Sequence, residues 1–312
     1  MSNLKEWNLS RALTRRVPFC AIQNRPTFRL PGDARVAVWV VPNIEHYEYQ
    51  PKDVRVRDPW PRMPHPDVFG YGGRDYGNRV GIWRLFDVLD KYSLRCTVSL
   101  SMSVIDMYPE IFEAMQARSW EYMSHGLYNT RYHWNYSKEE EREAINHCNE
   151  IHMRATGKPL SGWFSPAVSC TVNTPDLVKE AGISYYCDLY HDDQPTPVFT
   201  RHGPLISIPY SMDLNDAMVY RQPLEALEFS QMIIDHFDTV YQEGEQQPRV
   251  MCIALHPYMM GAPHRIKYLD RALAHIAAHD QVWFATGEEI AQWYRAHYLD
   301  RDVARLSGEL SP

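Results

Sequence analysis

The most informative stretch of this chain is Trp120-Glu121-Tyr122-Met123-Ser124-His125-Gly126-Leu127-Tyr128-Asn129. Its first half is a short predicted strand, and Gly126 lets the backbone turn sharply directly after His125. A histidine at the carboxyl end of a strand, just before a loop, is where parallel α/β proteins place their chemistry. The stretch therefore predicts a parallel β-sheet with a functional histidine at its edge.

Two further predicted strands end in the same way. Residues 36–41 are an apolar run that leads into Glu45 and His46, and residues 250–255 are another that leads into His256. A barrel or a doubly wound sheet gathers the carboxyl ends of its parallel strands at one edge. We therefore expect Glu45, His125 and His256 to converge in one pocket.

Strands and helices alternate along most of the chain. The predicted strands are residues 36–41, 97–100, 120–124, 162–165, 184–187, 205–208, 250–255 and 282–285. Predicted helices cover residues 109–118, 137–155, 174–181, 223–243 and 265–279, with one more after Asn78 and one after Thr286. This alternation predicts an α/β fold with a parallel sheet and right-handed crossovers. We expect one domain over residues 1–312, with residues 1–34 as an N-terminal arm.

Residues 51–77 interrupt the alternation. They are rich in proline and aromatic residues and end in several glycines. We expect a long loop here, because loops of this length in compact domains usually serve function or an interface. Asn78 is then the predicted N-cap of the amphipathic helix that follows.

The composition is that of an ordinary globular protein. Of the 312 residues, 45% are hydrophobic and 23% are charged. A formal net charge of −7 argues against a nucleic-acid surface, which needs basic patches. Residues 1–16 are too polar for a secretory signal, and no run is long enough to span a membrane. The six cysteines lack CxxC spacing, so we expect free thiols, a cytoplasmic location and no membrane partner.

Acidic residues after the strand at 184–187 are candidates for supporting His256. Asp188 and Asp192 both lie there. A carboxylate bonded to the far nitrogen of a histidine fixes its tautomer and raises its basicity. We expect Asp188 or Asp192 to hold His256 in this way.

Several other residues are candidates for contacting a substrate. Arg74 and Arg79 can donate to carbonyl groups as a fork, although both can equally flank the start of a helix. Trp163 and Tyr258 are candidate pocket walls, although aromatic residues at strand ends more often serve packing.

The motifs, taken in order from about residue 35 to residue 294, resemble those of the polysaccharide deacetylase (NodB-type) superfamily. That resemblance implies a distorted (β/α)7-type barrel with parallel strands. The family's aspartate pair, His-x-x-x-His, Arg-x-Pro and Leu-x-His motifs correspond to Glu45-His46, His125 with Asn129, Phe164-Ser165-Pro166 and Leu255-His256-Pro257.

The departures from these motifs bear on the cofactor. Asn129 replaces the family's second metal histidine, and His46 replaces a metal-binding aspartate. The resemblance implies a divalent metal such as zinc, for which Glu45, His46 and His125 would be three ligands with an open position for water. The region after Arg74 is closer to the allantoinase and cyclic imide hydrolase branch, for which the resemblance implies no metal. Both versions stay open.

The resemblance and the residues together predict a hydrolase that cleaves a C–N bond in a small cyclic amide or imide. Glu45 or the metal activates a water, and His125 stabilises the oxyanion. His256, held by Asp188 or Asp192, protonates the leaving nitrogen.

Substrate recognition in this hypothesis falls to Asn129 with Arg74 or Arg79, which would bind the edge of the substrate ring. The alternatives are a deacetylase of N-acetylated sugars and a catalytically inactive barrel that binds a small metabolite. The aromatic N-terminal region favours subunit contacts, so we expect a homo-oligomer.

Overall fold

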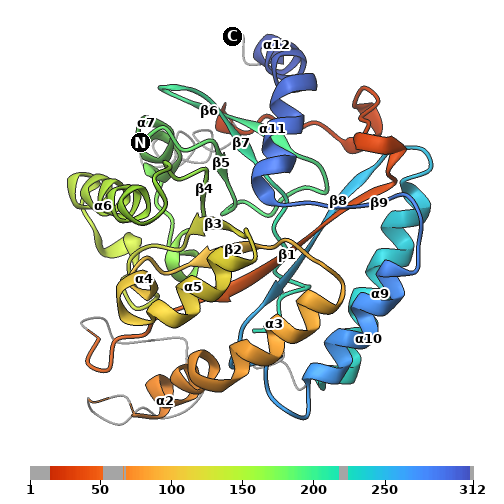
Figure 1. Cartoon of the computed structure of the whole chain (residues 1–312). Coiled ribbons are helices and arrows are strands. Elements are labelled where there is room, and N and C mark those ends of the chain that lie inside the picture. The colour runs from red at the N-terminus through yellow and green to blue at the C-terminus, as the bar shows by residue number, and fades with distance from the viewer. Residues whose placement is uncertain (1–14, 52–65, 67, 218–223, 310–312) are drawn as a thin grey trace, which may run out of the picture.

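The computed structural model describes residues 15–51, 66, 68–217 and 224–309 (Figure 1). Its strands are β1 Val36–Ile44, β2 Thr97–Leu100, β3 Glu121–Ser124, β4 Gly162–Trp163, β5 Tyr185–Tyr186, β6 Thr196–Thr200, β7 Gly203–Ser207, β8 Arg249–Leu255 and β9 Val282–Phe284. They form one nine-stranded sheet within the described residues, in the order β6-β7-β5-β4-β3-β2-β1-β8, with β9 paired to β1. The strand pairs are parallel except for the β6–β7 hairpin. The sheet curls into a half-barrel, which confirms the predicted fold class.

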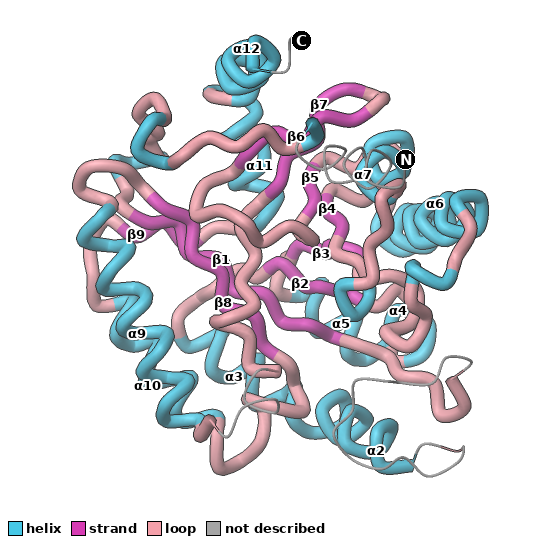
Figure 2. Tube along the Cα trace, turned by 180° about the vertical axis from the view of Figure 1, so that it is seen from behind, coloured by secondary structure: helices cyan, strands magenta, loops and turns pink. Residues whose placement is uncertain are grey.

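Helices surround this sheet (Figures 1 and 2). They are α2 Val68–Tyr76, α3 Ile82–Lys91, α4 Val104–Met107, α5 Pro109–Ala117, α6 Lys138–Thr156, α7 Thr174–Glu180, α9 Ala226–Glu243, α10 Ile266–Ala277, α11 Gly287–His297 and α12 Leu299–Glu309. α9 packs on β8 and on α10, and α10 in turn contacts α3. None of the described helices is long and apolar enough to cross a membrane.

The central strand β1 separates two apolar cores. Its residues are buried on both sides of the sheet, as expected for a central parallel strand. Val36, Val38 and Val40 belong to the core beneath the outer helices. Ala37 and Trp39 belong to the core inside the half-barrel. This alternation follows from the two-residue period of a strand, in which successive side chains point to opposite faces of the sheet.

Two predicted helix starts are confirmed by their caps. The side chain of Ser137 accepts a hydrogen bond from the backbone of Glu140 at the start of α6. Thr286 does the same with Glu289 at the start of α11. In both cases the glutamate returns a bond to the cap backbone, which completes a capping box.

The predictions for residues 51–78 were partly wrong. Residues 68–76 are helical, and the chain continues through the π-helical turn η3 (Gly77–Gly81) directly into α3. Asn78 is therefore inside a helix and caps nothing; its side-chain amide donates to the backbone oxygen of Glu45 at 2.9 Å. Residues 52–65 and 67 lie outside the described residues. The hairpin strand β6 and the helix α12 were not predicted from the sequence.

The described part of the N-terminal arm packs against the barrel. Phe28 and Leu30 are buried in the inner core. Arg25 forms an ion pair with Asp192, and the ring nitrogen of Trp293 donates to the backbone oxygen of Arg29 at 2.9 Å. All six cysteines are free thiols, as predicted.

The helical segment η3 approaches the loop after β8 so closely that only glycine fits. A Cβ on Gly81 would collide with the carbonyl oxygen of Pro257. We predict that Gly81→Ala lowers the free energy of unfolding by about 1–3 kcal/mol, the usual cost of overpacking. Urea unfolding followed by circular dichroism measures this change.

The matched control is Gly73→Ala in α2, where an added Cβ meets no atom within 4 Å. Because alanine favours a helix more than glycine does, this variant should gain stability, by up to about 0.5–1 kcal/mol. Equal effects at the two positions would contradict the close approach at Gly81.

Candidate active site

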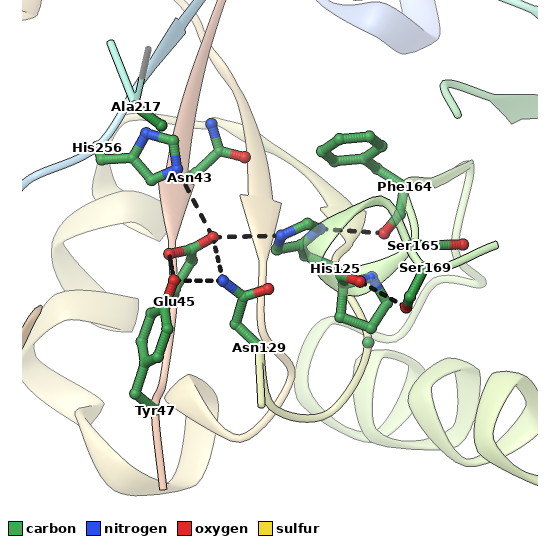
Figure 3. A network of polar contacts seen from close by, with 12 residues as sticks. Asn43, Glu45, Tyr47, His125, Asn129, Phe164, Ser165, Ser169, Ala217 and His256 are labelled. Atoms are coloured by element: carbon green, nitrogen blue, oxygen red, sulfur yellow. Dashed lines mark hydrogen bonds and ion pairs between the residues drawn. The ribbon is translucent and has the colours of Figure 1, made fainter. Parts of the chain in front are cut away.

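Glu45, one residue beyond β1, is the centre of a buried polar cluster (Figure 3). Its Oε1 atom accepts a hydrogen bond from the side-chain amide of Asn129 at 2.7 Å, and Oε2 accepts one from the hydroxyl of Tyr47 at 2.7 Å. The Nε2 atoms of His125 and His256 lie 3.3 Å and 3.6 Å from Oε1. The three strand-end residues singled out in the sequence thus converge in one place.

The parallel register explains this convergence. Asn43 of β1 pairs with Ser99 of β2, and Ser99 pairs with Met123 of β3, so the carboxyl ends of these strands are level. The backbone N–H of His125 continues the ladder by donating to the oxygen of Leu100 at 2.8 Å. On the other side of β1, Pro42 pairs with Leu255, directly before His256.

Asp216 holds His256. Its Oδ1 atom lies 2.6 Å from Nδ1 of His256, and its Oδ2 atom accepts the backbone N–H of His256 at 2.8 Å. With Nδ1–H donated to Asp216, the other ring nitrogen faces Glu45. Burial lowers the pKa of His256, but the charges of Glu45 and Asp216 outweigh burial and raise it to about 10. His256 is therefore an imidazolium at neutral pH.

The prediction that Asp188 or Asp192 supports His256 was wrong. Asp188 instead accepts hydrogen bonds from the backbone N–H and the hydroxyl of Ser165, at 2.8 Å and 2.7 Å. Asp192 pairs with Arg25 of the arm. Asp216, in the loop after β7, was missed. The strand-end signal used for the other residues does not single it out, because Asp216 lies eight residues beyond the predicted strand at 205–208 and Asp213 precedes it in the same loop.

His125 is fixed by its second ring nitrogen. Its Nδ1–H donates to the backbone oxygen of Phe164 at 3.1 Å, so Nε2 points at Glu45. The imidazole also stacks on the ring of Phe164, with centroids 4.9 Å apart and planes inclined by 16°. Phe164, which stands where the family carries an arginine, thus orients His125 by packing.

Glu45 is ionised in this setting. Burial raises the pKa of its carboxyl, but the charge of His256 and the hydrogen bonds from His125 and His256 dominate and hold the pKa well below its usual value. The site is therefore an anion held by hydrogen-bond donors from three separate strand ends.

Two buried polar atoms of the cluster lack a partner in the described residues. They are Oδ1 of Asn129 and Nε of Arg74. The guanidinium of Arg74 lies over the rings of Tyr47 and Tyr258, 4.8 Å and 5.3 Å from their centroids. The ring of Tyr258 is tilted against His256, with centroids 5.3 Å apart. Arg74, Asn129 and Tyr258, three of the predicted substrate-contacting residues, thus adjoin the cluster.

Three other candidates lie elsewhere. The Nδ1 atom of His46 lies 3.1 Å from the hydroxyl of Ser103, and its ring packs against Tyr108 and Tyr128. Arg79 is exposed and paired with Asp75. Trp163 is fully buried in the outer core rather than lining a pocket.

The predicted metal triad does not form. In the part of the chain that the structure describes, Glu45, His46 and His125 do not bring three ligand atoms close enough to share an ion. Asn129 turns its NH₂ group, a donor, toward Glu45, so it supplies no ligand atom in that direction. These residues do not fit the zinc site that the family motifs imply.

An ionised carboxylate between two imidazoles at the carboxyl edge of a half-barrel can accept and donate protons at a bound water or substrate. Residues 74–186 match the family model described as Polysaccharide deacetylase. A solved structure described as "probable Polysaccharide deacetylase from Pseudomonas aeruginosa PAO1" is 30% identical, with a TM-score of 0.78, over 90% of this chain and 99% of that one. The chain belongs to the polysaccharide deacetylase family, and it is a hydrolase acting on C–N bonds.

Two further relatives carry different substrate names. The crystal structure of Puue allantoinase is 27% identical, with a TM-score of 0.80, over 90% of this chain and 98% of that one. The peptidoglycan deacetylase of Helicobacter pylori is 25% identical over 264 residues, covering 71% of this chain and 89% of the relative. The family therefore establishes the class of reaction and leaves the substrate to the residues of the site.

The raised pKa of His256 predicts a pH-dependent contribution to stability. A group whose folded pKa exceeds its unfolded value stabilises the fold fully below the unfolded pKa, near 6.5, and loses this effect as pH rises through about 10. We predict that His256→Gln costs most free energy of unfolding at pH 6 and progressively less toward pH 10. Urea unfolding of both proteins across this range measures the difference.

His147→Gln is the control, because His147 is an exposed helix residue whose contact is a 3.7 Å ion pair with Glu150. Its cost should be small at every pH. A His256→Gln cost that stays constant from pH 6 to pH 10 would contradict the imidazolium assigned to His256.

Proposed function

We propose that this protein hydrolyses the C–N bond of a small cyclic amide or imide by activated water. The observation that supports this most is Asn129, which stands where the family's second metal histidine is found. Its NH₂ group is bound to Glu45, and its Oδ1 atom is buried without a partner in the described residues. The amide therefore offers an acceptor to a substrate N–H instead of a ligand to a metal.

Arg74 supplies the complementary donor. A ring amide presents N–H and C=O groups on one edge. Oδ1 of Asn129 can accept from that N–H, and Nε–H of Arg74 can donate to that C=O. Leaving a buried polar atom unpaired costs about 1–3 kcal/mol, so a substrate that satisfies both atoms gains affinity. Tyr258 and Tyr47 hold the guanidinium of Arg74 in place by stacking.

Three residues have separate roles in the proposed reaction. Glu45 accepts a proton from the attacking water; a water that displaces one of its present donors also makes the carboxylate more basic. His125, with a proton on each ring nitrogen, stabilises the oxyanion through Nε2–H, which lies 3.3 Å from Oε1 of Glu45. His256, already protonated, donates from Nε2 to the leaving nitrogen, while Asp216 keeps its ring oriented.

The proposed substrate class predicts a clear preference. We expect ring opening of hydantoins or cyclic imides, and release of acetate from N-acetylglucosamine oligomers slower by about 10⁴. We also expect the turnover to survive EDTA, because the cluster does not assemble the predicted metal ligands. Parallel assays by chromatography, with EDTA and with added zinc, measure both.

Substitutions of two arginines in the same helical segment, Arg74 and Arg79, provide matched variants for this test. Arg74→Ala should lower kcat/KM for the cyclic substrate by about 10–100-fold, since it removes one charged hydrogen bond. Arg79→Ala should leave it unchanged, because Arg79 is exposed and paired with Asp75. Release of acetate from chitin oligomers with no ring opening of any cyclic amide would instead identify a sugar deacetylase.

His125 gives a direct test of the mechanism. We predict that His125→Ala lowers kcat by about 10²–10⁴ because it removes stabilisation of the oxyanion. The free energy of unfolding should fall by no more than about 1–2 kcal/mol. Steady-state kinetics and urea unfolding measure the two effects, and His147→Ala is the control. A folded His125→Ala protein with full activity would reduce His125 to a structural role.

A further inference from the structure

We propose that Asp238, His275 and His279 form a binding site for a divalent transition-metal ion between α9 and α10. One ligand atom from each residue lies within 4.8 Å of the other two. Among the histidine, cysteine and acidic side chains of the described residues, these three are close enough together to hold an ion. The site is separate from the cluster around Glu45. Asp238 lies in α9, which precedes β8 in the chain. His275 lies in α10, which follows β8, and His279 comes just after α10.

The spacing of the two histidines places them side by side. His275 is in the last turn of α10, and His279 follows two residues beyond its end. Residues four apart lie on the same side of a helical segment, and the two rings here are 4.9 Å apart. Asp238 comes from α9, which packs directly on α10. The site therefore draws its ligands from two elements that the fold already holds together.

The hydrogen bonds of the two histidines leave the Nε2 atom of each ring as its possible metal ligand. Nδ1–H of His279 donates to the backbone oxygen of His275 at 2.9 Å, so the lone pair of its Nε2 is available for a metal. Nε2 of His275 lies 2.7 Å from Oδ1 of Asp238. An entering cation would replace the proton shared by these two atoms and bind both.

Aromatic neighbours restrict both imidazoles. The ring of Phe237 packs edge-on against His275 and His279, with centroids 5.8 Å and 5.0 Å away. Tyr241 packs on His279 at 5.1 Å, and its hydroxyl is anchored to the backbone oxygen of Asp280 at 3.0 Å. Little side-chain entropy then remains to be lost when a metal binds.

The donor set selects the class of metal. Two imidazoles and a carboxylate suit Zn²⁺, Ni²⁺ and Cu²⁺, whereas Mg²⁺ and Ca²⁺ prefer oxygen ligands. Asp238 is exposed and both histidines are partly exposed, so an ion can enter and keep water as its remaining ligand. A bound ion would join the two helices that flank β8 in the chain, and so it would stabilise the fold rather than take part in the reaction.

Zinc binding by the whole protein, purified without a histidine tag and stripped with a chelator, tests the site. We expect one Zn²⁺ per chain by equilibrium dialysis with metal analysis. We also expect a rise in Tm of about 3–5 °C when free Zn²⁺ is about a hundred times its Kd. Mg²⁺ at the same concentration should leave the Tm unchanged.

Variants locate the ion. His275→Ala and His279→Ala should each weaken zinc binding by at least about 10-fold, and Asp238→Asn should weaken it less. His147→Ala is the matched control, an exposed histidine on another helix. Glu45→Gln should bind zinc as the native protein does. Unchanged zinc binding in folded His275→Ala and His279→Ala proteins, loss of zinc in Glu45→Gln, or no zinc bound by the native chain would each overturn the proposal.

Discussion

The ionised carboxylate of Glu45, buried inside the barrel, is the constraint on which the rest of this site depends. An unpaired buried charge costs several kcal/mol, so the fold must bring donors to it from every side. Asn129, Tyr47, His125 and His256 do so, from the ends of three different strands. A shift of any one strand by a single residue would reverse its side chains and disturb the set of donors around this charge.

The sequence was sufficient to predict features that are set locally. The apolar runs of β1 and β8 and the short strand β3 are each followed at once by the residue that enters the site, so position along the chain was enough to find Glu45, His125 and His256. The capping boxes at Ser137 and Thr286 are local in the same sense, because both partners lie within four residues. These features need no knowledge of tertiary packing.

The features that were missed depend on long-range paths. Which acid reaches His256 is decided by the course of the loop after β7, and nothing near Asp188 in the sequence indicates that it turns to Ser165 instead. Asn78 shows the same limit, because its bond to the backbone of Glu45 joins residues that are 33 positions apart. The metal triad could have been questioned from the sequence alone. Successive residues of an extended chain point to opposite faces, so Glu45 and His46 could not readily face the same ion.

On the proposed function, the proton on His256 takes the place of a metal in balancing the charge at Glu45. Glu45 and Asp216 are two buried acids around His256, and their charges keep that imidazole protonated. The guanidinium of Arg74 supplies a second positive charge beside Tyr47. Metal-based sites polarise a carbonyl and lower the pKa of water, whereas a held imidazolium chiefly offers a proton. On the proposed function, this proton passes to the ring nitrogen as its bond to carbon breaks, so that the nitrogen leaves as a neutral N–H group.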